Sequence, residues 1–380
     1  MRILAIAHEK ELNGASLSLL EIIDCLSARH QFWVLTSYGE GPFYDALKAR
    51  KIPVAVQSFE RWMVRKNHPL KWLLKSWRWR LIESNRNRKT AYVTAKFIQE
   101  NKIDLIYTNT RVIDIGLRCA RLTGKPHVWH FREFGEEDFH MYPLLTAREH
   151  FGSIEKNTDV IICNSRAVYD KFSKEFRGKT KLCVVYNGVP EPEQKSQHMN
   201  EKIRFLITGR LSRAKGQLDA VQAVNELVKR GYTEFELLVA GPQRESYPEL
   251  QREAEKSGDL VKFLGLRTDM PYLRSITDVE LVCSRMEAFG RVTAEAMLAG
   301  NPVIGKNTGG TAELIEDGKN GFLYEPGNIE ELADRMEELI KEPARIKAMG
   351  EYAAEYAKDR FLIETCARKI EDIFIQVCRD

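Results

Sequence analysis

Short apolar runs that alternate with amphipathic segments constrain the fold of this chain more than any other feature of it. The runs of the first half lie at residues 2–7, 32–36, 52–56, 105–108, 127–130, 160–163 and 182–185. Segments 16–27 and 90–101 carry helical spacing between those runs. Strands that alternate with helices predict a parallel sheet of the doubly wound kind.

A second series of the same kind follows a polar, proline-containing stretch at 191–202, which we interpret as a linker. Its runs lie at 203–208, 235–240, 261–264, 279–283, 302–305 and 321–324, and the chain from 329 onward has helical spacing. The 380 residues exceed the roughly 250–300 at which single cores stop growing. We therefore expect an α/β fold with two Rossmann-like doubly wound domains facing across a cleft. Their expected bounds are 1–190 and 203–360, and a C-terminal helix at 361–380 is allowed to cross back to the first domain.

Composition excludes several classes of protein. With 43% hydrophobic and 29% charged residues the chain suits a globular protein. Its seven cysteines are scattered without a C-x-x-C pair, which disfavours a disulfide framework or a zinc site and favours a reducing compartment. No run approaches the ~20 apolar residues of a membrane helix, and the N-terminus resembles a first strand rather than a signal peptide. We expect a cytoplasmic protein.

The first motif that carries chemistry is the turn TGRLSRAKG at 208–216, between an expected strand and an expected helix. Gly209 permits a tight turn, and Arg210 and Lys215 would reach into the cleft as a pair of cations. A diphosphate needs such a pair, because Arg offers a planar fork to two oxygens and Lys a compact charge. The alternative is a solvated loop with surface charges.

The second motif is EAFGRVTAEAM at 287–297. A helix should begin near Arg291, after Gly290, and its free amides would seat phosphate oxygens. Glu287 and Glu295 would face uncharged sugar and ribose hydroxyls, since carboxylates accept hydroxyl hydrogens well. The alternative is a helix cap and a surface glutamate.

A third motif, NTGGTAE at 307–313, places paired glycines at a strand-to-helix turn, where a ligand can approach the backbone closely. The turn DGKNG at 317–321 follows it and is interpreted as structural. The order and spacing of the three motifs put them at the ends of successive strands, where doubly wound sheets hold nucleotides.

These motifs, with FLG at 263–265 and NGFLY at 320–324, closely resemble the retaining glycosyltransferases of family 4, which have the GT-B fold. The resemblance implies that Arg210 and Lys215 stabilise a departing diphosphate. It implies that Glu287 holds the donor sugar and Glu295 the ribose. The backbone at Ala288, Phe289 and Gly290 would contact the donor. Such enzymes retain the anomeric configuration and usually need no metal or cofactor beyond the nucleotide-sugar donor.

The first half resembles the family at fewer positions. Asn13 and Gly14 stand where the family usually has two glycines, and Gly14 would bring amides to the donor phosphate or the acceptor. His130 resembles the histidine that the family places against the donor sugar; a satisfied buried histidine is the alternative. The pair Asn109 and Thr110, at the end of its strand, is expected to touch the acceptor.

Residues 61–90 hold ten Lys or Arg, one acid and four of the six tryptophans. Basic, tryptophan-rich amphipathic segments bind anionic bilayer surfaces. A solvated helix face with a partly buried tryptophan ridge, or nucleic-acid binding, would have the same composition. We favour the membrane and expect no nucleic-acid partner, which places the protein peripherally on the inner face of the cell membrane.

The sequence thus predicts a hexosyltransferase that uses a nucleotide-sugar donor, a UDP-sugar before a GDP-sugar, with a lipid-linked glycan or glycolipid acceptor in surface polysaccharide synthesis. A sugar-nucleotide epimerase of the same fold and a non-catalytic nucleotide-sugar-binding protein are the alternatives.

Overall fold

The computed structural model describes residues 1–380 except 66–68, 177, 179, 197–200, 244, 245 and 380. The chain forms two compact units: unit 1 comprises 1–188 with 363–380, and unit 2 comprises 189–362. The chain therefore passes between the units twice, at 188/189 and at 362/363. The expected linker at 191–202 falls within unit 2, although its residues 197–200 lie outside the described part. Its Ser196 donates from its amide to Ala299 O (2.8 Å).

Unit 1 is built around a seven-stranded sheet in the order β3-β2-β1-β5-β6-β8-β9, with every neighbouring pair parallel. Its strands are β1 (Arg2–Ile6), β2 (Gln31–Thr36), β3 (Val54–Val56), β5 (Leu105–Thr108), β6 (His127–Phe131), β8 (Val160–Cys163) and β9 (Lys181–Val184). Its helices are α1 (Gly14–Leu26), α2 (Pro42–Ala49), α3 (Pro69–Arg78), α4 (Ser84–Glu100), α5 (Ile115–Thr123), α6 (Glu136–Phe139), α7 (Ala147–Asn157), α8 (Arg166–Phe172) and α16 (Ile363–Arg379). The central strands β5, β6 and β8 are buried throughout and β1 and β2 after their first residue, as continuous apolar runs require in parallel sheets, whereas the edge strands β3 and β9 are partly exposed.

Unit 2 repeats this plan with six parallel strands in the order β12-β11-β10-β13-β14-β15. Its strands are β10 (Ile203–Thr208), β11 (Phe235–Ala240), β12 (Val261–Gly265), β13 (Val279–Val282), β14 (Val303–Lys306) and β15 (Gly321–Tyr324). Its helices are α9 (Gln217–Lys229), α10 (Pro248–Glu255), η2 (Gly258–Leu260), α11 (Met270–Ser275), α12 (Arg291–Leu298), α13 (Gly309–Leu314), α14 (Ile329–Lys341) and α15 (Pro343–Phe361). The expected α/β fold with two doubly wound sheets is confirmed.

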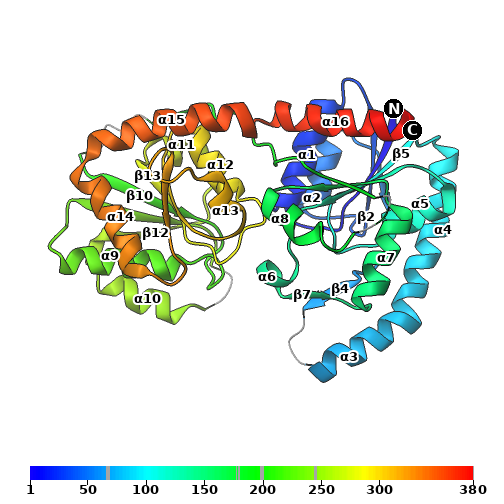
Figure 1. Ribbon diagram of the computed structural model, residues 1–380, viewed down its shortest axis with the longest axis horizontal. Helices are drawn as coiled ribbons and strands as arrows, with labels where there is room; N and C mark the ends of the chain where they lie inside the picture. Colours follow the sequence, from blue (N-terminus) through cyan, green and yellow to red (C-terminus); the bar gives the residue numbers. More distant parts are fainter. Residues whose placement is uncertain (66–68, 177, 179, 197–200, 244–245, 380) are drawn as a thin grey trace. The chain divides into compact units, whose positions relative to one another are not determined.

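The alternation of side chains along a strand separates the two cores of unit 2. Phe205 and Ile207 of β10 point into the large core shared with α9, α14 and α15, whereas Leu206 between them joins a small cluster with Leu273 of α11. Figure 1 shows α9 and α14 side by side on the large-core side of the sheet. Because all neighbouring strands of this sheet are parallel, their carboxyl ends meet at the same edge.

The last helix, α16, belongs to unit 1, where it packs along α1 (Figure 1). Its buried residues Ile363, Cys366, Ala367, Ile370 and Phe374 recur at helical spacing and join the core formed by α1 and β1. Burial of this apolar stripe explains why the chain returns to unit 1 after α15.

The basic segment at 61–90 forms structure that its composition did not define. It contains β4 (Met63–Arg65), then α3, a π-helical turn η1 (Trp79–Glu83) and the start of α4. β4 pairs antiparallel with β7 (Met141–Pro143) outside the main sheet. Residues 66–68 of the segment lie outside the described part. Figure 1 shows α3 at the end of unit 1 that is remote from α16.

Candidate functional site

The turn after β10 depends on glycines that no other residue replaces without strain. Gly209 has a φ of +121° and Gly216, the residue before α9, a φ of +71°. A Cβ at Gly216 would lie 2.1 Å from the backbone oxygen of Cys283, which directly follows β13. The loop is therefore held tightly against the neighbouring strand, which fixes the backbone positions of Arg210 and Lys215.

The two cations of this turn have different surroundings. Arg210 is exposed. Lys215 is about one-third exposed and donates through Nζ to Glu287 Oε1 at 2.5 Å. The structure thus brings together one residue of the first motif and one of the second, which lie 72 positions apart. The pair is half-buried, so its charges are only partly screened by water.

Glu287 also marks the contact between the second and third motifs. Its backbone oxygen accepts from the amide of Gly310 in α13 at 2.8 Å. A Cβ at Gly310 would lie 2.5 Å from the backbone oxygen of Phe289. Gly310 therefore permits close approach between two turns of the protein itself. Phe289 is buried against Phe361, with ring centroids 5.6 Å apart.

Helix α12 begins after Gly290, which has a φ of +92° and no side chain that could cap the helix. Ala288 and Phe289 precede it and are both buried. The start of this helix agrees with the start expected from the sequence at Arg291. A helix start of this kind favours an anion, because its first amides lack partners within the helix.

Glu295, one turn into α12, lies in an ion-pair chain that runs into the sheet. Its Oε2 accepts from Arg274 at 2.9 Å and its Oε1 from Arg291 at 3.2 Å. Arg274 in turn binds Glu280 of β13 at 2.9 Å. Each carboxylate oxygen has two lone pairs, so these two contacts leave Glu295 able to accept hydrogens from two further hydroxyls.

Arg274 and Glu280 are functional candidates that the sequence reasoning missed. Both are buried, and Glu280 also accepts from Thr208 Oγ1 at 2.9 Å. Burial raises the pKa of Glu280, while Arg274 opposes that rise with its charge. A lone acid inside the apolar strand run 279–283 was the available signal, because buried charges are found with partners.

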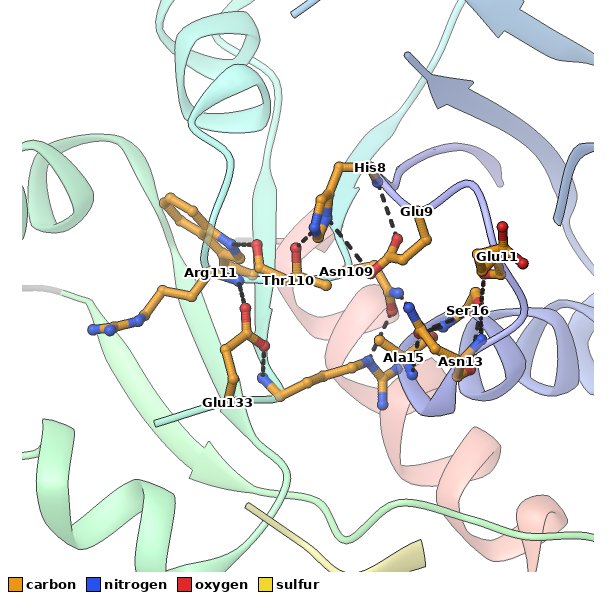
Figure 2. A network of polar contacts seen from close by, with 12 residues as sticks. His8, Glu9, Glu11, Asn13, Ala15, Ser16, Asn109, Thr110, Arg111 and Glu133 are labelled. Carbon is orange, nitrogen blue, oxygen red and sulfur yellow. Dashed lines mark hydrogen bonds and ion pairs between the residues drawn. The ribbon is translucent and has the colours of Figure 1, made fainter. Parts of the chain in front are cut away.

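The carboxyl edge of the unit 1 sheet carries a polar network that is mostly buried (Figure 2). His8, which follows β1, shares a hydrogen bond between its Nδ1 and Thr110 Oγ1 at 3.1 Å. Asn109 donates to Ala15 O (3.0 Å) and accepts from Arg132 Nε (2.8 Å). Asn109 and Thr110 are buried and already hydrogen-bonded, and their expected contact with an acceptor stays a prediction.

Gly14 is the first residue of α1, and Asn13 caps that helix. Asn13 Oδ1 accepts from the amides of Ala15 (3.0 Å) and Ser16 (3.1 Å), and Ser16 Oγ accepts from the Asn13 amide (2.7 Å). The substitution of asparagine for the family glycine thus has a visible consequence. Its side chain occupies two of the amides that a ligand phosphate would otherwise find at this helix start.

His130 of β6 is fully buried. Its Nδ1 shares a 2.7 Å hydrogen bond with the hydroxyl of Tyr107, whereas its Nε2 has no hydrogen-bond partner among the described residues. Burial, followed by the charge of Arg132, holds the pKa of His130 well below its usual value, so the ring is neutral. The histidine is therefore only half satisfied within unit 1.

Glu133 is a second buried acid that sequence reasoning missed. Its Oε1 accepts from the amide of Arg111 at 2.8 Å (Figure 2), and its Oε2 accepts from the amide of Arg132 at 3.1 Å. Burial raises the pKa of Glu133 to about 8. These bonds hold the backbone after β5 and β6 in one arrangement.

Among the described residues, no group of three or more His, Cys, Asp or Glu side chains is placed to hold a metal ion. The same residues include no helix that is both long enough and apolar enough to cross a membrane. The motifs therefore present cations, carboxylates and helix amides as their chemistry.

Comparison with known families gives two matches that follow one another along the chain. The family described as Glycosyltransferase Family 4 matches residues 12–191, and the family described as Glycosyl transferases group 1 matches residues 189–356. The first match spans most of unit 1 without β1 and α16, and the second spans most of unit 2. Together the two matches span most of the chain.

Curated relatives agree with this result. The chain is 29% identical to N-acetyl-alpha-D-glucosaminyl L-malate synthase of Bacillus anthracis over 248 residues, which cover 63% of the chain and 64% of that enzyme. It is 26% identical to a GDP-mannose-dependent alpha-(1-6)-phosphatidylinositol monomannoside mannosyltransferase of Mycobacterium tuberculosis, with 67% of the chain and 70% of the relative covered.

Solved structures share the fold over its whole length. HepE of Anabaena, crystallised with UDP and glucose, superposes with a TM-score of 0.80 at 25% identity, covering 99% of this chain and 100% of that one. The same protein has also been crystallised with UDP-glucose. Its two sheets, its motifs and these matches show that the chain belongs to the family 4 glycosyltransferases of GT-B fold.

Proposed function

We propose that the protein is a retaining hexosyltransferase that moves a sugar from a UDP-sugar to a hydroxyl of a lipid-linked glycan or glycolipid in surface polysaccharide synthesis. The observation that carries this proposal is the cluster at the carboxyl edge of unit 2. There Lys215 contacts Glu287, and Arg274 and Arg291 hold Glu295.

In this proposal Arg210 and Lys215 bind the diphosphate and meet the charge that develops as it departs. Interactions that strengthen in the transition state accelerate the reaction, whereas equal binding of substrate does not. Lys215 can turn from Glu287 to the phosphate because the pair is partly exposed. Glu287 is then free to accept hydroxyl hydrogens from the donor sugar.

Glu295 binds the ribose through the lone pairs that Arg274 and Arg291 leave open. The backbone at Gly209, Ala288, Phe289 and Gly290 lines the donor diphosphate and sugar, and Gly14 brings a further amide. His130, neutral and with Nε2 lacking a described partner, is suited to bind a sugar hydroxyl. Asn109 and Thr110 contact the acceptor. No step in this scheme requires a metal ion.

A UDP-sugar is proposed because HepE was crystallised with UDP and with UDP-glucose, at 25% identity and nearly full coverage. The mycobacterial relative is named as GDP-mannose-dependent, which keeps a GDP-sugar as the second candidate. A thermal-shift screen of UDP, GDP and their sugars tests the choice, since a ligand that binds only the folded protein raises its melting temperature.

The reaction itself is tested with the donor that gives the largest shift. Slow release of UDP from that donor without acceptor is the expected result, and the anomeric configuration of a glycoside product, read by NMR, tests retention. Appearance of an epimerised free nucleotide sugar would favour the epimerase alternative. Donor binding without any turnover would favour a non-catalytic binding protein.

An anionic membrane surface is the proposed location, reached through residues 61–90. Trp62 and Trp79 of this segment are buried, so only part of the tryptophan ridge is available. Leu70, Leu74 and Trp77 are 62%, 65% and 66% exposed. Flotation with anionic vesicles tests this location, which we place on the inner face of the cell membrane; absence of binding at low salt would discard it.

A further inference from the structure

Unit 1 contains a cavity of about 340 Å³ that extends from the end of β1 to helix α3. Its wall carries one histidine, His8, and the charged side chains Glu60, Arg61, Lys75, Arg78 and Glu83. His8 directly follows the carboxyl edge of the sheet, which is where sheets of this type present their ligands. The cavity therefore joins the functional edge of unit 1 to the exposed helix α3.

The cavity wall holds more positively charged side chains than acidic side chains that are free to pair with them. Glu83 pairs with Arg78 at 3.2 Å, and Glu60 pairs with Arg86, which lies outside the wall. No acidic partner of Arg61 or Lys75 is found among the described residues. Burial lowers the pKa of His8 at the far end of the cavity; the charge of Glu9 opposes this shift and the charge of Arg61 adds to it. The wall thus offers two unpaired positive charges.

Helix α3 places this charge beside an apolar stripe. Leu70, Leu73, Leu74 and Trp77 recur at three- and four-residue spacing, and all are more than half exposed. Lys71, Lys75 and Arg78 follow the same spacing, which puts them about a quarter turn away on the helix. Ser76 and Trp79 face the body of unit 1, where the Ser76 hydroxyl donates to Leu144 O. The cations therefore lie between the exposed apolar stripe and the buried face on one side of the helix.

We propose that this cavity binds the phosphate-bearing headgroup of an anionic lipid acceptor, whose chains lie along the apolar stripe of α3. This inference rests on the proposed transfer to a lipid acceptor. Arg61 and Lys75 supply charge to phosphate oxygens, as guanidinium and ammonium groups do in phosphate sites. The amphipathic helix supplies the apolar surface that an interfacial segment buries in a bilayer. The headgroup is then held next to the carboxyl end of β1.

The test measures co-sedimentation of the full chain with two kinds of vesicle of matched surface potential. One is phosphatidylcholine with phosphatidic acid, which exposes a phosphomonoester, and the other is phosphatidylcholine with phosphatidylglycerol. The variants are Arg61→Ala and Lys75→Ala, with Lys71→Ala as the matched control, because Lys71 lies on the same helix but not on the cavity wall. All three side chains are exposed, so folding is not at risk.

Wild-type protein should prefer phosphatidic acid, and Arg61→Ala and Lys75→Ala should each lose about fivefold of that preference. Lys71→Ala should weaken binding to both vesicles equally and keep the preference. An unchanged preference in Arg61→Ala and Lys75→Ala would overturn the inference. It would also be overturned by a thermal shift with inorganic phosphate alone that Lys75→Ala abolishes without any vesicle preference, which would indicate a soluble phosphate.

Binding at the donor site is measured separately, by the rise in melting temperature that UDP gives the wild-type protein. A UDP shift without selective vesicle binding contradicts the cavity proposal and leaves the proposed transferase function standing. Selective vesicle binding without a shift by any nucleotide or nucleotide sugar contradicts the transferase function instead.

Discussion

The two sheets of this protein end in edges of opposite character. At the carboxyl edge of unit 2, glycine turns bring charged side chains together while leaving them partly open, as in the Lys215–Glu287 pair. At the same edge of unit 1, the polar side chains are buried and hydrogen-bonded to backbone groups and to other side chains, as in Asn109 and Glu133. Three buried side-chain atoms at this edge have no hydrogen-bond partner among the described residues: His130 Nε2, Arg111 Nε and Asn164 Oδ1.

This difference indicates a division of labour. Partly open ion pairs can exchange a protein partner for a ligand at small cost, whereas a buried polar group that loses its partner is strongly destabilised. We therefore expect substitutions at the unit 2 edge to affect turnover first. Substitutions inside the unit 1 network should affect stability first.

The largest expected effect comes from the cations of unit 2. Arg210→Ala and Lys215→Ala should each lower kcat by about 10²–10³-fold, the range found when one donor to a developing negative charge is removed. Steady-state kinetics with the preferred donor measure it. Arg213→Ala is the control, because Arg213 lies in the same loop and pairs with Glu249. Near wild-type turnover in either variant would mean that the assigned phosphate site is wrong.

The next effect concerns the glycine turns. Gly216→Ala should reduce the free energy of unfolding by about 3 kcal/mol, because a positive φ is combined with a clash against the backbone of Cys283. Denaturant titration measures it. Gly231→Ala is the control, since Gly231 has a φ of +91° but open space around it, and it should cost about 1 kcal/mol. Equal costs would show that the turn is not tightly held.

A smaller effect tests the buried side chains of unit 1 through pH. Burial, with the charge of Arg111, holds the pKa of His150 well below its usual value. The unfolded chain takes up a proton near pH 6.5 and the folded chain does not, so His150 lowers stability as the pH falls below about 6.5. His150→Phe keeps the ring against Trp62, whose centroid lies 4.2 Å away. It should remove up to about 1.4 kcal/mol per pH unit of that loss.

Melting temperatures between pH 7 and pH 5 measure the difference between His150→Phe and wild type. The control is His140→Asn at an exposed position with a φ of +53°, which asparagine tolerates. If both variants showed the slope of the wild type, His150 would not be the proton-linked group.

The smallest effect is at Asn13, where unit 1 departs from the family glycine. Asn13→Gly should cost only a few tenths of a kcal/mol, and Asn13→Ala about 1 kcal/mol, because glycine is a better helix cap than alanine. If the amides of Ala15 and Ser16 serve a ligand phosphate, Asn13→Gly and Asn13→Ala should both lower KM for the donor, because both substitutions free these amides. Unchanged KM in both variants would assign Asn13 to helix capping alone.

Several elements could be predicted from the sequence because their causes are local. The apolar runs at 203–208 and 235–240 became β10 and β11 with those bounds, and the helix expected after Gly290 begins at Arg291. The hydrophobic period and the positions of glycines act over a few residues, so their effects can be predicted from the sequence alone. The family resemblance came from the same local motifs.

The partners of the charged side chains could not be predicted in this way. Arg274 binds Glu280 and Glu295, and it lies in a short helix, α11, whose sequence gives no sign of a functional role. The order of the strands brings these residues together, and a parallel sheet joins segments that are distant in sequence. The exposure of Trp77 beside the buried Trp79 likewise depends on which face of α3 and η1 packs against unit 1.

By itself, the sequence determined that the chain would form two parallel sheets with glycine turns and charged motifs after their strands. Tertiary structure alone decided which charges meet, which amides Asn13 occupies and where the cavity beside α3 opens. The physical reason is range: hydrophobic period and backbone freedom act locally, whereas ion pairs and cavities depend on the packing of segments that the fold brings together.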